Sequence, residues 1–162
     1  MDAYAGTPAR QRIQAIDRTS PEERTLPDPP LPIDASDNGS DTGEAKGYEA
    51  WSSQHPAIHI DQNQDVISDD GQEIYSLFSE QGITTMPILG VHTNTCVLHR
   101  PFGIKQMARW GIRPMLIRDL TDTMYNPEMP PYVSHEAGTE LVVGYIEKLW
   151  WPTILSDDLI SS

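Results

Sequence analysis

The sequence contains one cysteine, few basic residues and no long apolar run, and each shortage excludes a class of protein. A single thiol in 162 residues rules out an internal disulfide framework and fits a reducing compartment. Only 11 Lys and Arg residues stand against 24 Asp and Glu, without a basic stripe, so we expect no nucleic-acid partner. No apolar run approaches the roughly 20 residues that span a bilayer, and no signal peptide opens the chain. We therefore predict a soluble, cytoplasmic protein without a membrane partner.

The first third of the chain is dominated by turn-forming and acidic residues. Four prolines between residues 27 and 32 exclude a helix or a central strand, and residues 34–44 have almost nothing to bury. So long a loop is either a surface excursion or a separator between a short N-terminal tail and the domain. We assign residues 1–47 to an N-terminal remnant and loop, 48–156 to an α/β domain and 157–162 to a polar tail.

The rest of the chain alternates between strand and helix signals. Residues 68–80 open with capping residues and stop before Gly82, which predicts a helix with a glycine C-cap. A second helix is expected between Cys96 and Gly111, and a third over residues 136–148, with Ser134 as its N-cap and Leu141 among its buried residues. Strands are expected at residues 57–60, 86–90, 113–118 and 151–154, the second of them buried. This alternation predicts a parallel sheet with helices on both faces, and chemistry at the carboxyl ends of the strands.

The only cysteine lies where a strand is expected to turn into a helix. Residues 86–97 read MPILGVHTNTCV, an apolar run followed by glycine, capping residues and the thiol. A helix N-terminus offers free N–H groups and the positive end of the helix dipole, and both favour a thiolate. We therefore predict that Cys96 is a nucleophile; the alternative is a small buried residue without chemistry.

The segment GVHTNTCV at residues 90–97 resembles the nucleophile turn of the isochorismatase-like cysteine hydrolases, which include nicotinamidases and N-carbamoyl amidohydrolases. The resemblance covers roughly residues 57–154 and includes Gly111, the apolar run at 115–117 and Asp119. It implies a three-layer α/β/α sandwich with a mainly parallel sheet. It also implies hydrolysis of a small amide or carbamoyl-type C–N substrate through a thioester on Cys96. We expect no cofactor and no metal.

The same resemblance implies roles for the residues around the thiol. The backbone N–H groups of Thr95 and Cys96 would hold the oxyanion, following a strained peptide near residues 91–92. The residues expected to border the pocket are His92, Asn94 and Asp119. Asp119 has an alternative role, because an aspartate at the end of a strand more often braces the next loop.

Two members of the family's Cys-Asp-Lys arrangement have no matching residue in this chain. The family's aspartate ends its first strand, and nothing before residue 57 resembles that strand. The family's lysine would fall near residues 57–61, where His59 and Asp61 stand as substitute pocket residues. We therefore expect an N-terminally shortened chain that lacks the first strands. The strand at 86–90 would then have an open edge, which favours a homo-oligomer.

Three further interpretations stay open. A relative that has lost the base and the lysine would serve in binding or assembly. An exposed, redox-sensitive thiol would form a sulfenic acid or a mixed disulfide. The alternating residues His55, His59 and Asp61 form a weak metal-binding pattern.

Overall fold

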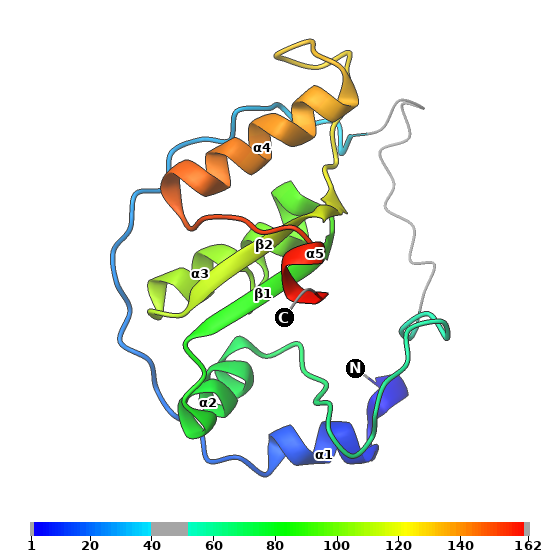
Figure 1. Cartoon of the computed structure of the whole chain (residues 1–162), viewed down its shortest axis with the longest axis vertical. Coiled ribbons are helices and arrows are strands. Elements are labelled where there is room, and N and C mark those ends of the chain that lie inside the picture. The colour runs from blue at the N-terminus through cyan, green and yellow to red at the C-terminus, as the bar shows by residue number, and fades with distance from the viewer. Residues whose placement is uncertain (1, 40–51, 161–162) are drawn as a thin grey trace.

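The computed structural model describes residues 2–39 and 52–160 and has a mixed α/β fold (Figure 1). Its elements are, in chain order, the 3-10 turn η1 (Asp2–Tyr4), α1 (Pro8–Gln14), α2 (Gly71–Gln81), β1 (Thr85–Val91), the π-helical turn η2 (Thr93–Val97), α3 (Ile104–Arg109), β2 (Arg113–Asp122), α4 (His135–Leu149) and α5 (Asp157–Ile160). None of the helices in this part of the chain is long and apolar enough to cross a membrane.

Strands β1 and β2 pair in parallel and form a two-stranded sheet. The paired residues are Thr85–Arg113, Met86–Pro114, Pro87–Met115 and Ile88–Leu116, and pairing resumes at Gly90–Thr121 and Val91–Asp122. One residue of β1 (89) thus faces four residues of β2 (117–120). This irregularity brings the carboxyl ends of both strands together just before the cysteine turn.

Strand β1 is an edge strand. On the far side of β2, Ile154 forms a single parallel bridge with Ile117, which makes β2 the central strand. Leu89 and Val91 are 58 % and 59 % exposed. The prediction of a strand at residues 86–90 is confirmed, but the prediction that it is buried is wrong, because no strand or helix covers these side chains within the described residues.

The backbone of β1 shows which way its free groups point. The carbonyl of Thr84 accepts the Arg113 N–H (2.9 Å), and the carbonyl of Gly90 accepts the Thr121 hydroxyl (2.8 Å). Even-numbered residues therefore face β2, and the polar groups of the odd-numbered residues face the open side. Pro87 lies among the latter, and a residue without an N–H group suits an unpaired edge.

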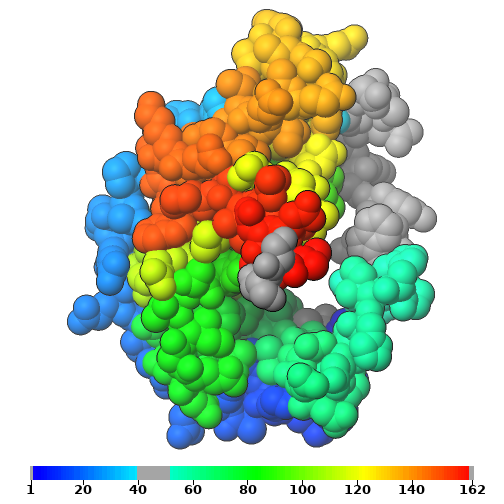
Figure 2. Space-filling model, viewed as in Figure 1, coloured from blue at the N-terminus to red at the C-terminus, as the bar shows by residue number. Residues whose placement is uncertain are grey.

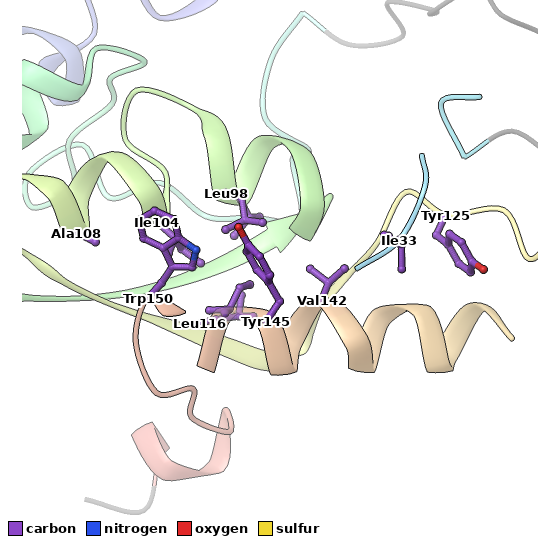
Figure 3. Packing of buried hydrophobic residues seen from close by; sticks show 11 residues of the cluster. Ile33, Leu98, Ile104, Ala108, Leu116, Tyr125, Val142, Tyr145 and Trp150 are labelled. Atoms are coloured by element: carbon purple, nitrogen blue, oxygen red, sulfur yellow. The ribbon is translucent and has the colours of Figure 1, made fainter. Parts of the chain in front are cut away.

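The hydrophobic core lies between α4 and the segment formed by η2 and α3. Leu98 and Ile104 approach from one side, Val142 and Tyr145 approach from α4, and Leu116 of β2 lies beside them (Figure 3). All five are buried. This core fixes the start of the η2–α3 segment, and with it the cysteine turn.

The helix predictions agree with the structure at their caps. The Asp70 side chain accepts the first N–H groups of α2, and Gly82 closes that helix in a left-handed conformation with φ 67°. Ser134 caps α4 by accepting the Ala137 N–H at 3.2 Å. Leu141 is 39 % exposed, so its predicted burial is wrong: it lies on the outer face of α4.

Two predicted strands are reduced or absent. Residues 57–60 contain no strand; a turn over residues 55–58 is closed by the Ile58 N–H, which donates to the His55 carbonyl (2.9 Å), and Ile58 is 56 % exposed. The short apolar run finds no neighbouring strand and uses its backbone locally instead. Residues 151–154 contribute only the bridge at Ile154.

The proline-rich segment packs against the domain. Residues 16–35 contain no helix or strand and run along the outside of the molecule from α1 to α4 (Figure 1). Ile33 is buried, and Leu26 and Leu31 pack against the core. The segment is thus a long surface excursion with buried anchors. Of residues 34–44, which were expected to have little to bury, residues 40–44 lie outside the described part of the chain.

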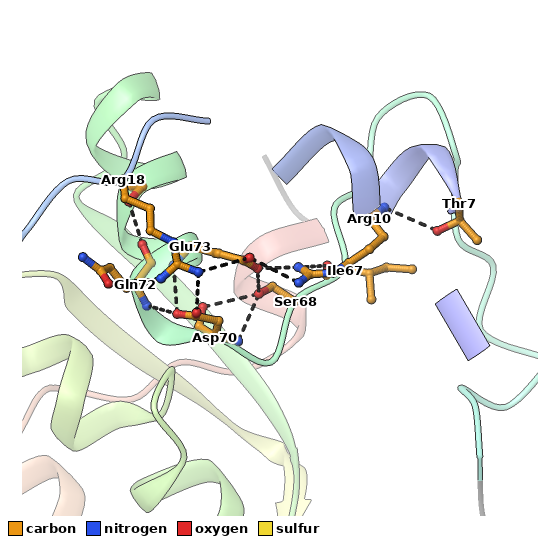
Figure 4. Close-up of polar contacts among 9 residues, drawn as sticks. Thr7, Arg10, Arg18, Ile67, Ser68, Asp70, Gln72 and Glu73 are labelled. Atoms are coloured by element: carbon orange, nitrogen blue, oxygen red, sulfur yellow. Dashed lines mark hydrogen bonds and ion pairs between the residues drawn. The ribbon is translucent and has the colours of Figure 1, made fainter. Parts of the chain in front are cut away.

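Helix α1 is attached to α2 by buried charge. Arg10 forms an ion pair with Glu73 through Nη1 and Nη2 of its guanidinium, and the Ser68 hydroxyl donates to the same carboxylate at 2.5 Å (Figure 4). The Glu73 side chain is 9 % exposed. These hydrogen bonds lower the pKa of Glu73, led by the one from Arg10, and they outweigh the opposing effect of burial.

Candidate active site

The cysteine turn is held against the end of β2. The peptide bond between Val91 and His92 is cis, and η2 begins directly after it. The buried Thr93 hydroxyl contacts the Thr121 hydroxyl (2.5 Å) and donates to the Asp122 carbonyl (2.9 Å). The turn that carries Cys96 is therefore fixed to the end of β2 by the Thr93 side chain.

Asn94 is a structural residue of this turn. It is 2 % exposed, its amide nitrogen donates to the Met124 carbonyl (2.9 Å), and its amide oxygen accepts the Met124 N–H (2.8 Å). Both polar ends are used, and Asn94 does not line the cavity beside Cys96. The prediction that Asn94 borders the pocket is wrong, because its side chain points into the protein to satisfy a buried backbone segment.

Cys96 lines a groove of about 370 Å³ that runs beside β1, and we call this cavity the Cys96 groove. Its wall consists mainly of apolar residues, including Met86, Ile88, Val97 and Phe102. Cys96 itself is a half-buried free thiol. Among the described residues, the other polar side chain in the wall is that of Arg100, and no Asp, Glu, His or Lys lines the groove.

The two backbone groups predicted to hold an oxyanion are those of Thr95 and Cys96. The Thr95 N–H donates to the His92 carbonyl (3.2 Å), which also accepts the Val97 N–H (3.1 Å). An oxyanion held by Thr95 would have to replace the first of these bonds. His92 is half-buried at the start of the turn, but its side chain does not line the Cys96 groove.

Asp119 lies away from the groove. It is exposed, and its carboxylate accepts the Ser156 N–H (2.9 Å) and the Ser156 hydroxyl (2.5 Å). These bonds, led by the one from the hydroxyl, lower the pKa of Asp119. Asp119 therefore braces the segment before α5, as the alternative interpretation stated, and the prediction of a pocket residue is wrong for this position.

His59 and Asp61 are also remote from the thiol. His59 is exposed and lines a separate cavity with Tyr4 and Ile67. Asp61 caps its own turn by accepting the Asn63 N–H (2.8 Å). In the space-filling view, residues 52–66 (cyan to green) are separated by a hollow from the C-terminal residues (red) (Figure 2). Neither residue replaces the family's lysine at Cys96, because the expected strand that would carry them there does not form.

Sequence reasoning missed a charged pair at the carboxyl end of β2. His135 contacts an Asp122 carboxylate oxygen through Nε2 (2.8 Å) and the Tyr125 carbonyl through Nδ1 (2.9 Å). Both partners accept hydrogen bonds, so both ring nitrogens carry hydrogen. The bond to Asp122, together with that to Tyr125, raises the pKa of His135. No local sequence signal connects residues 122 and 135, and neither lines the Cys96 groove.

Arg100 was also missed, although it carried a usable signal. It follows Cys96 by four residues, and its N–H donates to the Cys96 carbonyl (3.1 Å). Residues four apart in a helical turn lie on the same side of that turn. An arginine at this spacing from a candidate nucleophile therefore marks a second wall residue.

Comparisons with known proteins add no assignment. No family model matches the chain, and neither a curated protein nor a solved structure matches it. Among residues 2–39 and 52–160, no group of three or more His, Cys, Asp or Glu residues is placed to hold a metal ion. The functional argument therefore rests on the cysteine turn and its groove.

Proposed function

We propose that this chain is an isochorismatase-like cysteine hydrolase that acts on a small amide or carbamoyl-type C–N bond. The observation that carries the proposal is the position of Cys96: a half-buried thiol in the turn after a parallel strand, opening onto a groove of about 370 Å³. Ligand sites in parallel sheets lie at the carboxyl ends of strands. Pockets of roughly 300–1,000 Å³ hold small molecules.

The reaction proceeds through a thioester. The Cys96 sulfur bonds to the carbonyl carbon, and the C–N bond breaks as its electron pair and a proton go to the leaving amine. Water then attacks the thioester carbon, which releases the acid and restores the thiol. The apolar wall of Met86, Ile88 and Phe102 surrounds the acyl portion and keeps bulk water from competing for it.

A general base has to come from outside the described wall of the groove, since that wall contains no carboxylate, imidazole or amine. We propose that a strand pairs with the open edge of β1, in a longer form of the chain, and delivers the aspartate. This strand and further helices would complete the three-layer α/β/α sandwich. The support is the unpaired edge of β1, which runs along the same groove.

The hydrolase is tested by ammonia release from a panel of primary amides and N-carbamoyl compounds, using protein purified from its native source. We expect release by the wild type and an acyl adduct on Cys96 in its intact mass. Cys96→Ala should abolish both, whereas Thr95→Ser keeps the backbone N–H and should keep both. Turnover that persists in Cys96→Ala would refute the assignment. A native mass above 18.1 kDa is the expected result if a further strand is present.

The second candidate is a catalytically degenerate relative that serves in binding or assembly. The absence of an acid or base in the described wall of the groove favours it, as does the exposed edge of β1 with Leu89 and Val91. Under this alternative, the native mass stays at 18.1 kDa, no amide is hydrolysed, and Cys96→Ala leaves partner binding intact.

A further inference from the structure

The Cys96 groove combines an apolar wall with one positive charge. Met86, Ile88, Val97 and Phe102 supply apolar surface, and Arg100 supplies the charge. Arg100 is an exposed residue one helical turn beyond Cys96, so its guanidinium and the thiol serve the same cavity.

The guanidinium of Arg100 has no protein partner within residues 2–39 and 52–160. By contrast, Arg10, Arg18 and Arg109 each pair with a carboxylate of the chain. The Arg12, Arg113 and Arg118 side chains donate instead to carbonyl or hydroxyl oxygens of the chain, so Arg100 differs from these six arginines in keeping its guanidinium donors unused within the described residues. Because an apolar wall restricts the access of water, a charge beside it attracts a bound anion more strongly than the same charge would on an open surface.

We propose that the Cys96 groove binds a small organic carboxylate with an apolar body. Arg100 takes the carboxylate through its planar, bidentate donors, and the apolar wall takes the body. The identity of the substrate rests on the proposed function: the amide that Cys96 cleaves would carry a carboxylate at a distance from its scissile carbonyl. The binding of the carboxylate in the groove does not require catalysis.

Because the chain has a single cysteine, alkylation reports on this groove alone. We would compare the rates of Cys96 labelling by iodoacetate, which is anionic, and by iodoacetamide, which is its neutral analogue. Arg100→Gln should slow labelling by iodoacetate about five- to tenfold, the effect of one unit charge a few ångströms away in a partly wet site. Labelling by iodoacetamide should stay within about twofold, because that reagent has no charge for the guanidinium to attract.

Two control variants separate the site charge from net charge and from folding. Lys148→Gln removes the same charge from an exposed position on α4 and should change neither rate. Arg100→Lys keeps the charge and should keep most of the iodoacetate preference. Phenylacetate should protect Cys96 from iodoacetamide in the wild type, whereas the neutral phenylacetamide should protect it less, and 0.5 M salt should weaken the difference.

The proposal is overturned if Arg100→Gln, with an unchanged far-ultraviolet circular dichroism spectrum, slows both reagents equally or neither. It is also overturned if Lys148→Gln reproduces the effect. Neither result depends on turnover, so failure of the hydrolase assay and failure of the anion site are read separately. Phenylacetate protection without ammonia release would uphold the binding site and reject the hydrolase.

Discussion

Asp28 should be the most sensitive position in the N-terminal segment. Its carboxylate accepts the Lys105 ammonium (2.5 Å) and the Tyr145 hydroxyl (3.3 Å) on one oxygen, and the Arg109 guanidinium (2.9 Å) on the other. The Lys105 side chain is 7 % exposed, and its ammonium also lies 5.4 Å from the centre of the Trp150 ring. Asp28→Ala removes the partner and leaves this ammonium buried.

The size of the effect follows from the burial of each partner. Removing one member of a fully buried ion pair costs about 3–5 kcal/mol. The Asp28 side chain is 36 % exposed, so water screens part of the interaction and also reaches the site after the substitution. We therefore expect Asp28→Ala to lower the free energy of unfolding by about 2–3 kcal/mol. In a chain of 162 residues this corresponds to a fall in Tm of about 4–12 °C.

Acid should have the same effect as the substitution. Burial alone would raise the pKa of Asp28, but the hydrogen bond and charge of Lys105, together with Arg109, outweigh it and lower that pKa. A carboxyl whose pKa is lower in the folded state stabilises the fold above its unfolded value of about 3.9. That contribution is lost as the pH falls through the lower, folded pKa, and Asp28→Ala should lose less stability over this range than the wild type.

Urea denaturation followed by tryptophan fluorescence measures the loss. Glu22→Ala, an exposed acidic position in the same segment, is the control and should change the free energy of unfolding by less than about 0.5 kcal/mol. In a double-mutant cycle with Lys105→Met, Asp28→Ala should cost at least about 1 kcal/mol less than in the wild type, because the buried charge is already gone. Additive losses, or an Asp28→Ala variant as stable as the wild type, would refute the assigned ion pair.

Two glycines of α4 should respond in opposite directions to alanine. A Cβ at Gly138 would lie 2.4 Å from a ring carbon of the buried Tyr125, so Gly138→Ala should destabilise the fold by about 1–2 kcal/mol. Gly144 has open space around it, so Gly144→Ala should stabilise the fold by about 0.5–1 kcal/mol. Thermal unfolding of both variants checks the two signs, and equal shifts in Tm would contradict the packing. For His135, whose pKa is raised by Asp122, stability should be present below the unfolded pKa of about 6.5 and be lost as the pH rises through the higher folded pKa. An NMR titration of the His135 ring should show this folded pKa, and Asp122→Asn should lower it; an unchanged titration would reject the pair.

Local chemistry made the helices predictable. Asp70 and Gly82 bound α2 because a capping carboxylate and a residue that accepts a positive φ are needed within one or two residues of the helix ends. Ser134 does the same for α4. The two parallel strands were also predictable, since a short apolar run between two helix signals is typical of a strand in a parallel sheet.

The contacts that were missed join residues far apart in the sequence. Asp28 and Lys105 are 77 positions apart, and no composition or spacing signal shows that a proline-rich segment carries the partner of a buried lysine. The predicted strand at residues 57–60 does not form, because this segment lies away from the sheet and the Ile58 N–H is used within a local turn. Asn94 was assigned to the pocket from its position beside Cys96, whereas the unpaired backbone of Met124 determines where its side chain points.

The groove lacks a general base, and the sheet lacks a strand on the open edge of β1 within the described residues. Both gaps lie beside the Cys96 groove. Strand β1 runs along the Cys96 groove, and its odd-numbered residues direct unused backbone groups to the open side. A strand pairing there in parallel would end near the carboxyl end of β1, within a few residues of Cys96. It would bring its own side chains to a wall whose polar side chains, among the described residues, are only those of Cys96 and Arg100. The strand that completes the sheet would then also complete the catalytic site. Any segment that restores hydrolysis should also protect the amide of Leu89 from hydrogen exchange, and a segment that does one without the other would separate the hydrolase from the edge-pairing proposal.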